Sequence, residues 1–141
     1  MDRCLVVANK TLLSDELLDA IRSRMEERAC EFHLLVPASH PWRAWSDGSI
    51  KAAARQRLEE GRAHFAEQGI ECAGEIGDAN PVFAVTDLLL RDRFDEILIS
   101  TLPSGPSAWL HQDVPARLRR IVSMPVAHVV TAAPQRAVSP L

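Results

Sequence analysis

A hydroxyl-rich loop contains the residue types in this sequence that could do chemistry. It follows the apolar residues 97–99, which are bounded by Asp95 and Glu96 and therefore predict a short buried strand. Helix-compatible sequence follows the loop, and unpaired backbone N–H groups at such a junction favour an anion. The loop could therefore bind a phosphate, or it could be a turn that only caps itself. Its candidate ligand-binding residues are Ser100, Thr101, Ser104, Gly105 and Ser107.

Two further loops carry candidate residues. Asn9 and Thr11 follow the apolar residues 4–8, which predict a strand buried on both faces. Asn9 could hydrogen-bond a base or a ribose, or it could tie its loop to the next one. The loop at 37–48 is longer than most connections. Its Trp42 and Trp45 could stack on a ligand ring or cover the end of the sheet.

Composition and charge exclude several function classes. The chain has 141 residues and a net charge of −3, so it has no basic excess for binding nucleic acid. Its apolar runs are too short for a signal peptide or a membrane span. Three scattered cysteines are typical of reduced thiols. The short apolar runs and these cysteines together predict a cytoplasmic location. The five histidines lack metal-ligand spacing, and Ser107 with His111 lacks a third catalytic group, so neither a metal site nor a catalytic triad is predicted.

Apolar runs alternate with helical patterns along the chain. The predicted strands are residues 4–8, 32–36, 70–76, 97–99 and 126–131. The predicted helices begin at Ser14, near Ser49, at Asn80 with Pro81 in the first turn, and after Asp113. As the N-cap, the Asp113 carboxylate would accept the free N–H groups of the following turn and so occupy donors that a phosphate needs.

This alternation predicts a doubly wound α/β fold with a parallel five-stranded sheet and helices on both faces. Residues 70–76 alternate with a period of two, which is typical of an edge strand, whereas the first and fourth strands are apolar enough for the centre. Strand order 3-2-1-4-5 satisfies both conditions. In that order Asn9–Thr11 and the loop 100–107 face each other across a crevice. We expect one domain over residues 1–131 and a flexible tail over 132–141.

Several segments, taken in order, resemble the universal stress protein family. They match its first strand and turn, its Gly-Asp-Pro helix entry, its fourth strand and its closing Pro-Val strand. The matching segments are residues 5–11 with Ser14, 77–81, 95–101, 124–126 and 129–130. The resemblance implies a nucleotide-binding-type fold, a homodimer, a role in the stress response and no established catalysis.

The sequence departs from the ATP-binding members of that family. They carry Gly-x2-Gly-x9-Gly-Ser/Thr after the fourth strand, where this chain has Ser100-x2-Pro103-x9-Asp113-Val114. Their first-strand Asp, which contacts the adenosine, is Asn9 here. Val36 matches a second-strand position that contributes to adenine binding. The chain therefore resembles a divergent member that lacks the glycines of the ATP-binding motif.

Two functions from different classes remain open. In the first, the crevice binds an adenine nucleotide or another small anion in a regulatory role. In the second, the protein is a ligand-free dimeric scaffold that acts through protein contacts. Both include a homodimer through strand 126–131, because an unpaired edge strand exposes a row of backbone groups.

Overall fold

Parallel strands form the central sheet of the computed structural model, which describes residues 1–38, 47–102 and 113–131. The strands are β1 (Asp2–Val7), β2 (Cys30–Pro37), β3 (Cys72–Gly77), β4 (Glu96–Thr101) and β5 (Val126–Val130). Their order in the described part is β3-β2-β1-β4-β5, so the predicted fold class and strand order are confirmed. β1 lies in the middle, with Val6 opposite Leu34 of β2 and Leu98 of β4.

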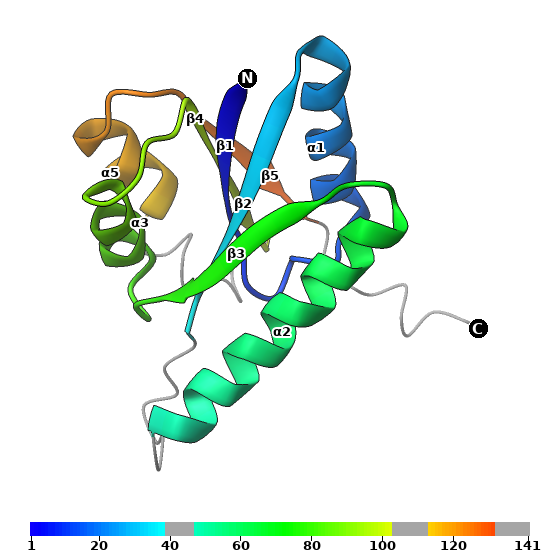
Figure 1. Ribbon diagram of the computed structural model, residues 1–141. Helices are drawn as coiled ribbons and strands as arrows, with labels where there is room; N and C mark the ends of the chain where they lie inside the picture. The colour runs from blue at the N-terminus through cyan, green and yellow to red at the C-terminus, as the bar shows by residue number, and fades with distance from the viewer. Residues whose placement is uncertain (39–46, 103–112, 132–141) are drawn as a thin grey trace.

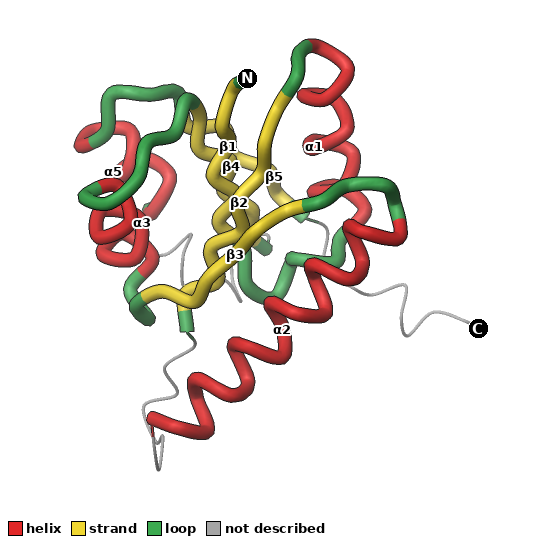
Figure 2. The backbone as a smooth tube through the Cα atoms, viewed as in Figure 1, coloured by secondary structure: helices red, strands yellow, loops and turns green. Residues whose placement is uncertain are grey.

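Helices cover both faces of the sheet, as predicted. They are α1 (Asp15–Glu27), α2 (Asp47–Glu67), α3 (Pro81–Leu89) and α5 (Val114–Ile121). Figure 1 shows α1 and α2 on one side of the sheet and α3 and α5 on the other. Figure 2 shows the strands as the middle layer between these helices.

Alternate residues of the central strands supply two hydrophobic cores. Cys4 and Val6 of β1 pack toward α1 and α2, whereas Leu5 and Val7 pack toward α3 and α5. A strand that contributes to both cores must be apolar at every position, which explains the continuous run at 4–8. On the α2 side the contact is close at Gly61, where an added Cβ would lie 2.7 Å from Leu12 Cγ.

Local signals set the helix boundaries. Ser14 caps α1 by accepting a hydrogen bond from Leu17 N at 3.1 Å, and Asn80 caps α3 by accepting one from Val82 N at 2.9 Å. α2 ends before Gly69, whose φ of 81° lies in the left-handed region that glycine adopts without strain. The predicted helix starts at Ser14 and Asn80 are confirmed.

All five strands in the described part of the chain differ from their predicted bounds by one or more residues, and the differences at β4 and β3 change where individual side chains lie. β4 extends through Ser100 and Thr101, which the sequence pattern predicts to be in the loop, because both residues pair with β5. β3 begins at Cys72, and Ile70 is instead buried in the core below α2. The predicted tail at 132–141 lies outside the described residues, so the division of the chain at 131 stays a prediction.

Candidate functional site

The reversal of strand order places a candidate site at the carboxyl ends of β1, β2 and β4. From β1 the chain runs outward to β2 and β3 and then crosses to β4 on the other side. Connections leaving β1 and β4 therefore diverge, and this divergence is where doubly wound sheets bind ligands. The segments that meet here are the Asn9–Thr11 turn, the ends of β2 and β4, and one side chain of α2.

Buried hydroxyl groups join the two sides of this crevice. Thr11 Oγ1 lies 2.6 Å from Ser100 Oγ, which lies 3.4 Å from Thr131 Oγ1. Thr131 Oγ1 in turn lies 3.0 Å from Ser14 Oγ. The predicted approach of the Thr11 turn to Ser100 is thus present. A ligand that used these hydroxyls would compete with their internal partners.

We expect Ser100→Ala to lower the free energy of unfolding by about 1–3 kcal/mol, because it leaves the buried Thr11 hydroxyl without its nearest partner. Adding Thr11→Val to Ser100→Ala should recover part of this loss, since the second change removes the unpaired group. Urea unfolding of the two single variants and the double variant measures the coupling. Strictly additive losses would show that the pair contributes nothing as a unit.

Asn9 bridges the first turn to the end of β2 and to α2. Its Nδ2 donates to the Pro37 carbonyl at 2.6 Å, and its Oδ1 accepts from Arg57. Of the two roles predicted for Asn9, the one in which it ties its loop to the next loop is therefore present. Arg57 is not among the residues predicted from the sequence, although its position next to the core residue Leu58 is consistent with the border of α2 that faces the sheet.

The remaining candidates are in different environments. Val36 is fully buried in the core on the α1 and α2 side. Thr101 Oγ1 lies 2.7 Å from His128 Nε2 on β5. Three candidates, Ser104, Gly105 and Ser107, lie outside the described residues, as do Trp42 and Trp45.

Asp113 occupies the predicted N-cap position of α5 but does not cap the helix. Its backbone is left-handed, with φ 56° and ψ 45°, and its side chain makes no capping hydrogen bond among the described residues. An N-cap side chain reaches the first-turn N–H groups from an extended backbone. The predicted capping is therefore wrong. The left-handed conformation favours glycine, the residue that the matching family position carries.

His128 gives the β4–β5 end of the site a pH dependence. Burial lowers its pKa from the ordinary value of 6.5, and the Arg119 guanidinium lowers it further. Because the folded state binds this proton less tightly than the unfolded state, His128 contributes stability fully above about pH 6.5. That contribution falls as the pH drops toward the lower folded pKa.

We therefore expect the free energy of unfolding to fall between pH 7 and pH 5, and to fall less in His128→Gln. Glutamine keeps a hydrogen-bonding group near Thr101 but does not titrate. The Glu75 carboxyl does not interfere in this window. Burial opposes its charged form, but hydrogen bonds from Arg91 and His33 outweigh burial and hold its pKa below 4.5. Urea unfolding at both pH values is the measurement, and equal losses in the two proteins would contradict the assignment.

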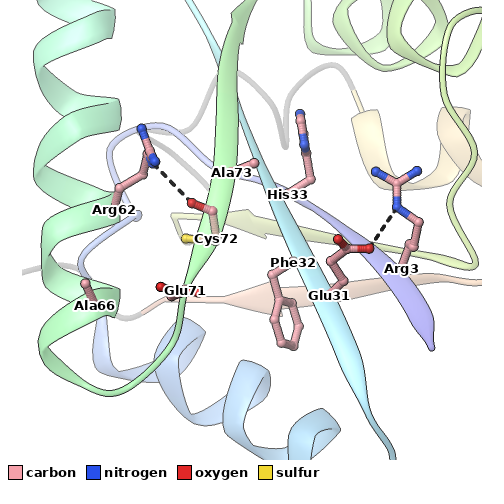
Figure 3. A pocket seen from close by; sticks show the side chains of 9 residues that line it. All are labelled: Arg3, Glu31, Phe32, His33, Arg62, Ala66, Glu71, Cys72 and Ala73. Carbon is pink, nitrogen blue, oxygen red and sulfur yellow. Dashed lines mark hydrogen bonds and ion pairs between the residues drawn. The ribbon is translucent and has the colours of Figure 1, made fainter.

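A separate concave surface lies away from this crevice, over the amino-terminal halves of β1, β2 and β3. Figure 3 shows its lining side chains, and its volume is about 560 Å³. Several of its charges are already paired: Arg3 contacts Glu31 and Asp92, and Arg62 donates to the Cys72 carbonyl at 3.1 Å.

The described residues contain no cluster of metal-ligating side chains. They also contain no helix long and apolar enough to cross a membrane.

The strand order and the helices on both faces define a doubly wound α/β fold. Comparison with solved structures narrows this class to the fold of universal stress proteins. Over 92% of the chain it superposes on 93% of a universal stress protein from Archaeoglobus fulgidus, with a TM-score of 0.63 and 16% identity. Over 96% of the chain it superposes on 95% of a universal stress protein family protein from Arabidopsis thaliana with AMP bound, with a TM-score of 0.61 and 13% identity. No family model and no curated protein sequence matches the chain.

Proposed function

We propose that this protein is a cytoplasmic regulatory protein of the stress response that binds a small molecule in its crevice. An adenine nucleotide is the ligand we favour. The observation that carries the proposal is the shared strand-order reversal, because a similar fold from Arabidopsis thaliana has AMP bound. The polar groups of Asn9, Arg57, Thr11 and Ser100 lie at this reversal and could hold a ribose or a phosphate.

Binding can be tested on freshly purified protein without choosing the ligand in advance. Small molecules extracted from it are identified by mass spectrometry, and AMP, adenosine and ATP are then titrated by calorimetry. We expect an adenine compound in the extract and saturable binding at a one-to-one ratio. If the extract is empty and none of the three compounds binds, the adenine-binding proposal fails.

A ligand-free dimeric scaffold is the second candidate function. Two observations favour it: the hydroxyls of Thr11 and Ser100 hydrogen-bond each other, and β5 pairs only with β4 in the described part of the chain. The outer edge of β5 could pair antiparallel with a second copy about a twofold axis. Both candidates share this proposed homodimer.

Val130 offers the sharpest test of the dimer. Its side chain is 49% exposed on β5, whereas Val129 packs against the core and its replacement would also disturb folding. We expect Val130→Glu to convert a dimer to a monomer in sedimentation, and Leu90→Glu at the exposed C-cap of α3 to leave the dimer intact. A monomeric unmodified protein would refute the dimer.

A further inference from the structure

Arg57 combines partial burial with the absence of a carboxylate partner in the described part of the chain. Arg22 and Arg119 also donate to neutral groups, Gln68 Oε1 and the Val126 carbonyl, but both arginines are exposed. Arg3, Arg24, Arg28 and Arg91 each pair with at least one carboxylate. Within residues 1–38, 47–102 and 113–131, Arg57 forms no ion pair, and its hydrogen-bond partner is the neutral amide of Asn9. Its side chain is also half-buried, so water compensates the charge only in part.

A half-buried guanidinium with one neutral partner has unused binding capacity. Arginine carries five N–H donors in a planar fork, which matches the two oxygens of a carboxylate or phosphate. Asn9 holds the Arg57 head group beside the turn after β1, and Asn9 is itself held by the Pro37 carbonyl. The head group is therefore positioned at the crevice rather than extended into solvent.

A second cation lies in the turn that Arg57 contacts. Lys10 follows Asn9, is exposed, and has no ion-pair partner in the described part of the chain. The turn after β1 thus carries the charge of Lys10 and is contacted by the charge of Arg57 from α2, and no described carboxylate pairs with either. Summed charge of one sign in a crevice raises the local concentration of ions of the opposite sign.

We propose that Arg57 is an anion anchor, and that the ligand of the crevice carries an oxyanion, either a phosphate monoester or a carboxylate, bound by Arg57 with support from Lys10. The anchor rests on the proposed small-molecule site but not on the adenine part of that proposal. It lies on α2, outside the loop between β4 and α5 where the glycine motif of ATP-binding relatives would be, and this chain lacks those glycines. The Arg57 guanidinium donates hydrogen bonds to the anion, as backbone N–H groups do in a glycine-rich loop.

The test compares Arg57→Gln with Arg55→Gln. Arg55 is exposed on the same helix, so both variants lose one positive charge from α2. Inorganic phosphate and acetate are added to each protein at constant ionic strength, with chloride as the reference anion. The thermal midpoint and the NMR shift of the Arg57 Nε–H are recorded, and the two anions separate phosphate from carboxylate recognition.

We expect phosphate or acetate to shift the Arg57 resonance and to raise the midpoint of the unmodified protein and of Arg55→Gln, but not of Arg57→Gln. Without added anion, Arg57→Gln should be at least as stable as the unmodified protein, because it removes an uncompensated charge. If neither anion shifts the Arg57 resonance, or if Arg57→Gln responds like Arg55→Gln, the anchor is refuted. A purely structural Arg57 would instead make the anion-free variant less stable.

A second arm separates the anchor from the adenine proposal. We expect AMP to bind the unmodified protein about tenfold more tightly than adenosine, and Arg57→Gln to bind the two equally. If adenosine binds but AMP has no advantage, the anchor fails while adenine binding stands. If neither binds while inorganic phosphate still acts through Arg57, adenine binding fails and the anchor stands.

Discussion

Replacing Glu96 by alanine is expected to lower the free energy of unfolding by about 3–5 kcal/mol. The Glu96 side chain is 12% exposed and accepts three hydrogen bonds from two arginines of the α1 region. Arg24 donates through Nε and Nη2 at 3.1 and 3.0 Å, and Arg28 donates through Nη2 at 3.0 Å. Without Glu96, the guanidinium of Arg24 stays mostly buried and loses its carboxylate partner.

The loss should exceed that of an exposed pair of the same types. Glu31 is 60% exposed and pairs with Arg3 at 3.3 Å, so Glu31→Ala should change stability by less than about 1 kcal/mol. Glu96→Gln, which keeps the shape but removes the charge, should give an intermediate loss. Urea unfolding of the three variants is the measurement. Equal losses for Glu96→Ala and Glu31→Ala would mean that the buried pair does not hold α1 against the sheet.

Asp113→Asn is expected to raise the affinity for ATP at least about tenfold and to leave the affinity for adenosine unchanged. By its resemblance to ATP-binding universal stress proteins, the sequence places Asp113 at the position of the last motif glycine. A carboxylate at that position would repel the phosphates of ATP. Two unit charges 4 Å apart interact by about 1 kcal/mol in water. Since Asp113 is exposed, this lower limit applies to each phosphate charge, and a triphosphate carries several of them.

The substitution isolates the charge, because Asp113 makes no capping hydrogen bond that the change could remove. Asparagine also tolerates the left-handed backbone at this position. Calorimetry with ATP and adenosine is the measurement, with Asp19→Asn on the exposed face of α1 as a control that removes one equal charge elsewhere. Tight binding of ATP to the unmodified protein, or equal ATP affinities in the two variants, would show that Asp113 does not limit phosphate binding.

The strand order could be predicted because it depends on burial alone. Residues 4–8 and 97–99 are continuously apolar and occupy the centre, whereas the alternating strand that ends at Gly77 occupies an edge. The caps at Ser14 and Asn80 were predictable for a similar reason. Each depends on a side chain and the N–H groups of the next turn, so the partners are within three residues.

Tertiary structure alone decided where polar groups are tolerated inside the sheet. Glu96 and Ser100 are polar, so the sequence predicts a strand only over residues 97–99, which lie between them. Both residues are nevertheless buried in β4. Their partners are Arg24, 72 positions away, and Thr11, 89 positions away. A burial penalty that distant partners remove cannot be read from neighbouring residues.

The candidate site divides in the same way. That Asn9 and Ser100 lie at one edge follows from the strand order, which the apolar patterns predict. That Arg57 meets Asn9, and that Asp113 adopts a left-handed backbone instead of capping α5, depends on how α2 and α5 pack against the sheet. Local propensities select the elements, but only their packing brings together charges from different elements, and those charges decide which ligand the crevice can hold.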